Sequence, residues 1–380
     1  MMKMEEKTNF QKSEKRQVIL MLTQTCNLNC KYCYQNHKKA GKMSIKTAKD
    51  ILVKEIEYIN NDEWTKTAEI SFLGGEPLLN FETLKETAEW LWTQTITKPF
   101  ELTIRTNGTL LDDEMKAWFL QNKHRISLGL SLDGLSDMNK LNRTSTDVDW
   151  RFFVENWPTQ RVNMVLFSDT VQYLSRSVIE MKENKIPINV TIGEGFEWTA
   201  DQASILEEQL INLIPLYLTD PEEAKASGLF CRVDDFFPEI PIDNFPFCWK
   251  TNNIISYNTD GSPCICHMFT NPSQGEMMSR WSWERFRETE KVPNDPVCIK
   301  CPVQKNCKRC FGLDLKVCGS IFKSASRVTI CKAVKAKTRA SAMYFLKNLE
   351  AKKMNNEPAT PYDFENAARA LRLLEELHYE

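Results

Sequence analysis

Short apolar segments alternate with amphipathic segments over the first half of the chain. Six runs of four to seven residues are almost continuously apolar and rich in β-branched side chains, which is typical of parallel strands buried on both faces. Each run ends in a polar or glycine-containing turn, and a helical pattern follows. The runs cover residues 18–22, 68–73, 102–105, 126–132, 162–167 and 188–192.

Apolar residues spaced near a 3.6-residue period predict helices between these runs. The first helix should begin after Ser44 and the second after Asn80, because both side chains are good helix N-caps. Six strand–helix units predict an α/β fold with right-handed crossovers. An open doubly wound sheet and a curved, partial barrel both fit this pattern, and both place chemistry at the carboxyl ends of the strands. Further helices are expected at 113–122, 150–157, 171–183 and 203–216.

The alternating pattern stops near Cys231, where proline, glycine, asparagine and cysteine become dense. Turn residues at 259–262 predict a hairpin there, and helical patterning returns at 334–349 and 364–377. We therefore expect four parts of the chain. They are an N-terminal extension (1–17), an α/β domain (18–230), a cysteine-rich domain (231–333) and C-terminal helices (334–380).

Charge and hydrophobicity restrict the expected partners and location. The 49 Lys and Arg residues nearly balance the 51 Asp and Glu residues, so no large positive field favours nucleic acid or an anionic membrane. The apolar run at 18–22 is too short for a signal sequence or a membrane span. We therefore expect a cytoplasmic protein. Thiols stay reduced there, so the 13 cysteines favour metal binding or catalysis over disulfides.

Three cysteines, Cys26, Cys30 and Cys33, directly follow the first apolar run with CxxxCxxC spacing. No fourth cysteine lies nearby in the sequence, so a four-iron cluster bound here would keep one iron open to an external ligand. A structural zinc site would need four protein ligands, and His37 is the available fourth. Both interpretations are open at this point.

Nine more cysteines fall between residues 248 and 331, and Cys231 stands alone. A zinc ribbon on Cys298, Cys301, Cys307 and Cys310 would suit the paired CxxC spacing. It would leave the other cysteines of this region unexplained. The nine are at positions 248, 264, 266, 298, 301, 307, 310, 318 and 331.

The first cysteine motif resembles that of the radical S-adenosylmethionine (SAM) superfamily, in which an aromatic residue, here Tyr32, precedes the third cysteine. Three further segments resemble the family and follow successive predicted strands. They are Gly74-Gly75-Glu76-Pro77, Thr106-Asn107-Gly108 and Ser131-Leu132-Asp133-Gly134. The resemblance implies a partial (β/α)6 TIM-like barrel and a [4Fe-4S] cluster held by three cysteines and SAM. It also implies reductive cleavage of SAM to a 5′-deoxyadenosyl radical that abstracts hydrogen from a substrate.

The resemblance also implies which residues contact SAM. Gly74 and Gly75 should let the backbone approach the methionine amine, because neither carries a side chain. Arg143 should bind the SAM carboxylate, although Arg151 is a rival for that role. The implied SAM contacts are Gly74, Gly75, Glu76, Asn107, Ser131 and Arg143.

The later cysteines resemble a SPASM domain, which carries auxiliary iron–sulfur clusters in maturases of sulfatases and of ribosomally made peptides. The resemblance implies two auxiliary [4Fe-4S] clusters. The interval between Cys307 and Cys310 is shorter than in many relatives, so Cys318 could replace Cys310. One cluster would use Cys248, Cys266 and Cys310 with Cys264 as a possible fourth ligand, and the other Cys298, Cys301, Cys307 and Cys331.

The SPASM resemblance implies a peptide or protein substrate that is cross-linked, oxidised or epimerised, and a reductant such as flavodoxin or ferredoxin. Residues 1–17 are too few for a leader-binding domain, so a leader peptide would need another docking surface. Sulfatase maturases carry an aspartate as proposed base after the Cys266 position, where this chain has His267. His267 is the candidate base here, or a polar strand residue without a catalytic role. A radical enzyme acting on a small molecule, a formylglycine-forming sulfatase maturase and a non-catalytic zinc protein are the alternatives.

Overall fold

A computed structural model describes residues 13–145, 148–237, 244–246, 253–287, 291–293, 295–307 and 309–378. The six predicted strands are all present and lie within a few residues of the expected positions. They are β1 (Lys15–Thr23), β2 (Thr67–Gly74), β3 (Phe100–Thr106), β4 (Ile126–Leu130), β5 (Val162–Leu166) and β6 (Ile188–Ile192).

The strands form a curved parallel sheet in chain order, which confirms the predicted α/β fold. Neighbours β1 to β4 pair in parallel, β5 pairs with β6, and a bridge between Ser131 and Asn163 connects the two groups. Two more strands extend the sheet beyond β1. Strand β8 (Ile254–Tyr257) pairs in parallel with β1, and β9 (Pro263–Cys264) pairs antiparallel with β8 through the hairpin predicted at 259–262.

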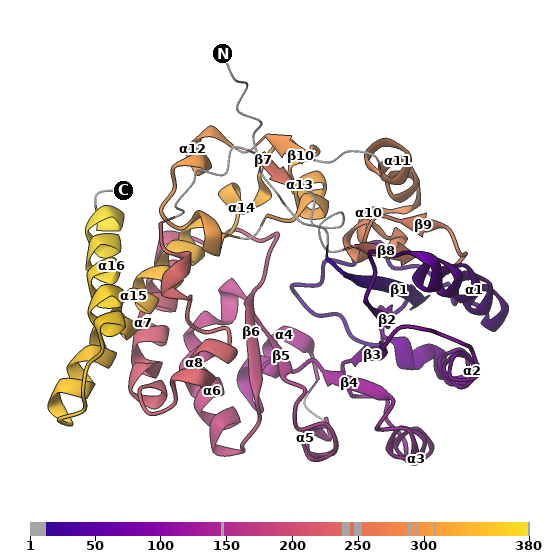
Figure 1. The fold of residues 1–380 in the computed structure, drawn as a ribbon, viewed down its shortest axis with the longest axis horizontal. Helices are drawn as coiled ribbons and strands as arrows, with labels where there is room; N and C mark the ends of the chain where they lie inside the picture. The colour runs from indigo at the N-terminus through magenta and orange to yellow at the C-terminus, as the bar shows by residue number, and fades with distance from the viewer. Residues whose placement is uncertain are drawn as a thin grey trace.

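The helices lie on the outer face of the arc of strands (Figure 1). The hydroxyl of Ser44 caps the first helix, as predicted, by accepting a hydrogen bond from the amide of Thr47. Asn80 does not cap the second, because its side chain instead donates to the carbonyls of Leu22 and Met43. The helices of this region are α1 (Ile45–Asn61), α2 (Phe81–Leu91), α3 (Asp113–Gln121), α4 (Asp137–Arg143), α5 (Trp150–Asn156), α6 (Leu174–Glu183) and α7 (Ala200–Tyr217).

The two faces of the sheet differ in polarity. On β3, Leu102 and Ile104 are buried in the main core with the helices, and the alternating residues point to the inner face. The inner face carries a hydrogen-bonded polar group, in which the hydroxyl of Ser71 contacts Thr103 at 2.6 Å and Glu69 at 3.0 Å. A polar inner face is suited to a polar ligand rather than to a closed hydrophobic core.

The cysteine-rich region contains short helices where the sequence predicted mainly turns, and they cross the carboxyl ends of the strands (Figure 1). The amide of Trp198, after β6, donates to the carbonyl of Thr329 at 3.1 Å, which joins this region to the barrel. Its elements are η3 (Val233–Asp235), β7 (Asn244–Pro246), η4 (His267–Phe269), α10 (Asn271–Gln274), α11 (Glu276–Phe286), β10 (Lys291–Pro293), α12 (Pro296–Ile299), η5 (Gln304–Asn306), α13 (Phe311–Cys318) and α14 (Ala325–Val328).

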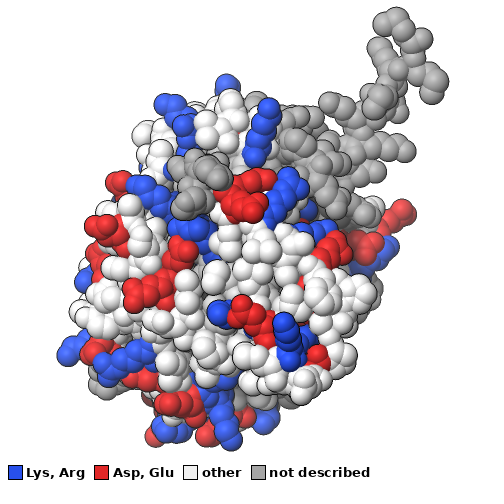
Figure 2. Space-filling view, turned by 90° about the vertical axis from the view of Figure 1, so that its left-hand side faces the viewer, with Lys and Arg blue, Asp and Glu red and all other residues white. Residues whose placement is uncertain are grey.

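The predicted C-terminal helices are present as α15 (Cys331–Met354) and α16 (Pro361–His378), and α15 packs along both α7 and α16. The short helix α8 (Pro221–Ala226) follows α7. Acidic and basic side chains are intermixed on the face shown in Figure 2, without a large area of one sign. Among the described residues, no helix is both long and apolar enough to cross a membrane.

Candidate functional site

The first cysteine group lies in the loop that follows β1. Cys26, Cys30 and Cys33 are half-buried, and their thiols are close enough to influence one another electrostatically. Burial raises the pKa of Cys30 to about 11, the positive charge of Arg143 opposes the rise, and the other two thiols add to it. Iron would offset this cost, because a metal ion stabilises the thiolate form that binds it. The three thiols thus lie in one loop within electrostatic reach of one another, and their joint binding of a cluster stays a prediction.

Gly75 holds this loop at the end of β2. Its amide donates to the carbonyl of Thr23 at 3.1 Å, and the amide of Glu76 donates to the carbonyl of Thr25 at 2.9 Å. A Cβ atom at Gly75 would lie 2.2 Å from the Thr25 oxygen and 2.9 Å from the amide nitrogen of Cys26. Glycine is therefore required here for the cysteine loop to approach the backbone. The predicted contact of Gly74 and Gly75 with the methionine amine stays a prediction.

Glu76 connects the ends of β2 and β3 through a buried carboxylate. It accepts hydrogen bonds from the Thr106 hydroxyl at 2.7 Å, the Asn107 amide at 2.8 Å and the Leu78 amide at 3.2 Å. Burial raises the pKa of Glu76, and these three donors oppose the rise. The side chain is 1% exposed, so its orientation is set by the protein before any ligand binds.

Asn107 reaches from the end of β3 back to the cysteine loop. Its Nδ2 donates to Asn27 Oδ1 at 3.0 Å and lies 3.8 Å from the sulfur of Cys26. Its Oδ1 accepts from the amide of Thr109 at 3.0 Å. The structure thus brings the predicted residues Glu76 and Asn107 together beside the first cysteine group.

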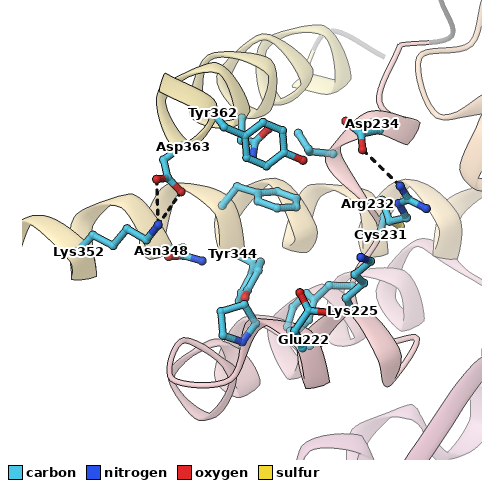
Figure 3. A pocket seen from close by; sticks show the side chains of 16 residues that line it. Glu222, Lys225, Cys231, Arg232, Asp234, Tyr344, Asn348, Lys352, Tyr362 and Asp363 are labelled. Atoms are coloured by element: carbon cyan, nitrogen blue, oxygen red, sulfur yellow. Dashed lines mark hydrogen bonds and ion pairs between the residues drawn. The ribbon is translucent and has the colours of Figure 1, made fainter. Parts of the chain in front are cut away.

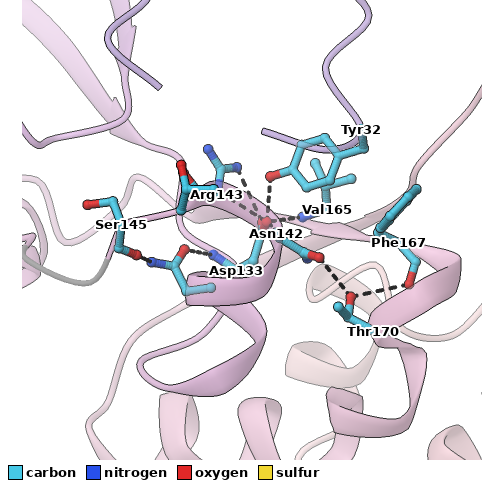
Figure 4. A network of polar contacts seen from close by, with 10 residues as sticks. Tyr32, Asp133, Asn142, Arg143, Ser145, Val165, Phe167 and Thr170 are labelled. Carbon is cyan, nitrogen blue, oxygen red and sulfur yellow. Dashed lines mark hydrogen bonds and ion pairs between the residues drawn. The ribbon is translucent and has the colours of Figure 1, made fainter. Parts of the chain in front are cut away.

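Asp133, after β4, is the centre of a second polar network (Figure 4). Its carboxylate accepts from the Arg143 guanidinium at 3.2 Å, from the Val165 amide at 2.8 Å and from the hydroxyl of Tyr32. Its own amide donates to Asn139 Oδ1 at 3.0 Å. The sequence marked this segment as a family motif but did not predict that Asp133 would organise it. An aspartate directly after a predicted strand, with an arginine ten residues later, was the available signal.

The structure separates the two arginines considered for the SAM carboxylate. Arg143 is buried, pairs with Asp133 and stacks over the ring of Tyr32 at 5.5 Å, next to the cysteine loop. Arg151 lies outside this network and stacks on Trp150 at 4.3 Å. Ser131 is half-buried at the end of β4, where its amide donates to the Thr106 carbonyl at 2.9 Å. The contacts of Arg143 and Ser131 with SAM stay predictions.

Four of the later cysteines line one cavity. They are Cys298 within α12, Cys301 and Cys307 on either side of η5, and Cys331 at the start of α15. Burial raises the pKa of Cys307 to about 12, and the charges of the other three thiols add to the rise. A zinc ribbon would use Cys310 as its fourth ligand. In the structure, Cys331 rather than Cys310 lines this cavity with the other three cysteines. These four cysteines are the ones predicted to hold one auxiliary cluster, and that assignment stays a prediction.

The cysteines predicted to hold the other auxiliary cluster have different neighbours. Cys266 and Cys310 both lie near Tyr34, and their charges raise its pKa after the larger effect of burial. Cys264 is buried in the smaller core cluster, near Ser279 and Asn258. Cys248, the third predicted ligand of this cluster, lies outside the described residues.

Cys318, the alternative to Cys310, ends α13, and the charged groups that influence it are Asp314, Lys323 and Arg309. In the part of the chain that the structure describes, no three His, Cys, Asp or Glu side chains are arranged to share one metal ion.

Tyr34 and His267 meet where the first cysteine loop contacts the cysteine-rich region. Their rings lie 5.9 Å apart, edge to face. Lys316 on α13 fixes the contact by donating to Asn36 Oδ1 at 2.6 Å, the Ser273 carbonyl at 2.9 Å and the Tyr34 carbonyl. Desolvation lowers the pKa of His267 to about 4, and the positive charge of Arg105 adds to the effect. His267 is therefore neutral at pH 7, the form that a general base requires.

A separate cavity of about 320 Å³ lies between α8, α15 and α16 (Figure 3). Two ion pairs lie in its wall, Lys352 with Asp363 at 2.8 Å and Arg232 with Asp234 at 3.5 Å. Cys231, which belongs to neither cysteine group, lies in this wall with its sulfur 3.9 Å from the Thr338 hydroxyl. None of the predicted ligands or SAM contacts is among the residues that line this cavity.

Residues 20–157 match the family model of the radical SAM superfamily. This segment contains the first cysteine group, Gly75, Glu76, Asp133 and Arg143. The residues that match the family are therefore the ones that the structure brings together after β1, β2 and β4. The chain carries a radical SAM domain.

Curated relatives share parts of this chain. The radical SAM cyclopropyl synthase TigE of Paramaledivibacter caminithermalis is 26% identical over 187 residues, which cover 43% of this chain and 38% of TigE. A cysteine-type anaerobic sulfatase-maturating enzyme of Clostridium perfringens (strain 13 / Type A) is 30% identical over 128 residues, covering 31% and 32% of the two chains. The chain spans less than two fifths of the length of the curated relatives it matches.

A solved structure extends the likeness of the fold beyond the radical SAM domain. Native anSMEcpe with bound AdoMet and Cp18Cys peptide superposes with a TM-score of 0.60 and 17% identity. The match covers 90% of this chain and 100% of that chain. At this identity the comparison establishes the fold, including the region after the barrel.

Proposed function

We propose that the protein is a radical SAM/SPASM enzyme that modifies a peptide or protein. The single observation that carries the proposal is the three-cysteine group after β1, held by Gly75 in a domain that matches the radical SAM family. A [4Fe-4S] cluster bound there with SAM would supply the electron for reductive cleavage, giving a 5′-deoxyadenosyl radical that abstracts hydrogen from the substrate. The product would be a cross-link, an oxidation or an epimerisation.

The surrounding residues would hold and orient the cofactor. Cys26, Cys30 and Cys33 would bind the cluster, leaving one iron for SAM. Glu76 and Asn107 are already fixed beside the loop, which supports their proposed contacts with the methionyl group. Residues held in place before the ligand binds need no reorganisation when it arrives.

Two auxiliary [4Fe-4S] clusters are part of the proposal. The cavity lined by Cys298, Cys301, Cys307 and Cys331 supports one of them. The second would use Cys266 and Cys310, which lie on the same side of the molecule as Tyr34, together with Cys248 and Cys264. Flavodoxin or ferredoxin would supply electrons, and the enzyme would act in the cytoplasm, where thiols stay reduced.

Peptide or protein substrates are favoured by the relatives. One relative is named a sulfatase-maturating enzyme, and the anSMEcpe structure contains a peptide. His267 is the proposed base, because it is neutral and lies beside Tyr34, which follows the first cysteine group. A base in that position would accept the proton released when the substrate radical passes its electron to an auxiliary cluster.

Anaerobic reconstitution with iron and sulfide tests the proposal. We expect about 11 to 12 irons per chain, broad absorbance near 400 nm and release of 5′-deoxyadenosine after reduction in the presence of SAM, as cluster stoichiometry implies. A colourless protein that binds zinc and leaves SAM intact would contradict it. Coexpression with a peptide encoded beside this chain, followed by mass spectrometry, separates a peptide substrate from a small molecule.

A further inference from the structure

Arg105 is a cation on the inner face of the sheet. It alternates along β3 with Leu102 and Ile104, which are buried on the helix side, and its own side chain is exposed. Its register partner on β4 is Gly129, and a Cβ atom there would meet nothing closer than the Ile104 oxygen at 3.8 Å. The neighbouring strand therefore leaves room beside the guanidinium.

No described residue neutralises this charge. Within residues 13–378, as far as the structure describes them, the guanidinium of Arg105 forms no ion pair and donates no hydrogen bond. Glu69, the acid that influences it most, pairs with Lys15 at 2.6 Å. By contrast, Arg16 and Arg143 each pair with a buried carboxylate, at 2.9 and 3.1 Å. Arg105 thus keeps donors in a planar arrangement that matches a carboxylate.

Arg105 also lies at the carboxyl end of β3, two residues before Asn107, which contacts the first cysteine loop. Its charge acts on both Tyr34 and His267, so it lies near the contact between the first cysteine loop and the cysteine-rich region. The side chain is accessible, yet desolvation is the main influence on its pKa and lowers it. Ionic interactions are stronger where protein partly excludes water, so a carboxylate bound here would be held firmly.

We propose that Arg105 binds a carboxylate of the substrate peptide close to the residue that is modified. The substrate segment would then carry an aspartate, a glutamate or a terminal carboxylate at that place. Arginine binds a carboxylate through two parallel hydrogen bonds, which also fixes its orientation. The inference rests on the proposed function, because it takes the ligand to be the substrate; the carboxylate of SAM is the other possible source of the same chemistry.

Binding to peptide pools tests the proposal on the anaerobically reconstituted holoprotein with SAM present. The probes are acetylated, amidated pentapeptides with randomised flanks and a central Glu, Gln or Lys, measured by equilibrium dialysis and mass spectrometry. We expect the Glu pool to bind about tenfold more tightly than the Gln pool, as a charge-assisted pair predicts. R105Q should abolish this preference, R105K should retain part of it, and R105E should favour the Lys pool.

R125Q is the matched control, because Arg125 stacks over Trp92 at 5.3 Å away from this face, and it should keep the preference for Glu. Iron content and circular dichroism establish that each variant folds. Equal binding of the Glu and Gln pools by the unmodified protein would overturn the proposal, as would a preference that persists in R105Q. Weaker SAM binding by R105Q without a change in peptide preference would overturn it too, and would assign Arg105 to SAM. Glu-pool binding without 5′-deoxyadenosine release would instead contradict the proposed function alone.

Discussion

The carboxylate of Asp133 lies 3.1 Å from the guanidinium Nε of Arg143, and the two side chains are 0% and 8% exposed. This buried pair joins the end of β4 to the end of α4. Because Asp133 also binds Tyr32 and the amide of Val165, the pair ties the cysteine loop to β5. It therefore holds the loop of the first cysteine group against the ends of β4 and β5.

Replacing Asp133 with asparagine should strongly destabilise the protein. D133N leaves the buried Arg143 without its counter-charge, which typically costs about 3–5 kcal/mol. Urea denaturation measures the free energy of unfolding. The double variant D133N/R143Q should recover part of the loss, and a loss below about 1 kcal/mol in D133N would mean that the pair is dispensable.

C30A should abolish release of 5′-deoxyadenosine and remove about four irons, because two cysteines cannot hold a site-differentiated cluster. The irons bound by the later cysteines should remain. Iron analysis and chromatography of the reaction products measure both effects. C231A is the matched control and should keep full iron content, since Cys231 lies in the separate cavity near α15. Retained SAM cleavage in C30A would exclude the assigned cluster site.

G75A should displace the cysteine loop and impair iron binding at the first site. The added methyl group would lie 2.2 Å from the Thr25 oxygen, so the backbone would have to move, and overpacking of this kind typically costs about 1–3 kcal/mol. Iron content and thermal stability report the change. G129A adds the same methyl group where the nearest atom is 3.8 Å away, and it should leave both quantities nearly unchanged. Normal iron loading in G75A would show that the loop tolerates the shift.

C307S should remove one auxiliary cluster, because Cys307 lines one cavity together with Cys298, Cys301 and Cys331. We expect about four fewer irons and weaker absorbance near 400 nm. C318S should keep the iron, since Asp314, Lys323 and Arg309 are the charged groups that surround Cys318. If C318S loses as much iron as C307S, the proposed division of the cysteines is wrong.

The rate of peptide turnover should fall on the acid side only at a pH well below the ordinary pKa range of histidine. Burial and Arg105 lower the pKa of His267 from 6.5 to about 4, so it stays neutral, and able to accept a proton, as the pH falls from 8 to 6. Activity that depends on this base should then fall between about pH 5 and 4. Rates measured against pH test this expectation, and H267Q should lack that limb. An inflection near pH 6.5 that disappears in H267Q would contradict the lowered pKa.

Local patterns predicted the barrel well because each strand is an apolar run that alternates with an amphipathic helix. The same logic found Ser44 as a cap, since the hydroxyl acts within three residues. Local patterns failed where the paired strands are far apart in the sequence. The partnership of β8 with β1 joins Gln17 to Ile254, and nothing in either short segment specifies the other. The short helices of the cysteine-rich region were also missed, because they pack around a small second core rather than following a long apolar period.

By itself, the sequence determined the chemical types at the site: three closely spaced thiols, glycines at a strand end, and later cysteines in a repeated spacing. These features can be recognised from residue type and from spacing within short segments of the chain. Only the tertiary structure decided which groups meet, such as Asp133 with Arg143, Tyr34 with His267, and Arg105 with an inner face where no described residue forms an ion pair with it. Those relationships arise from packing between segments far apart in the chain, where burial and the loss of water set the strength of each charge.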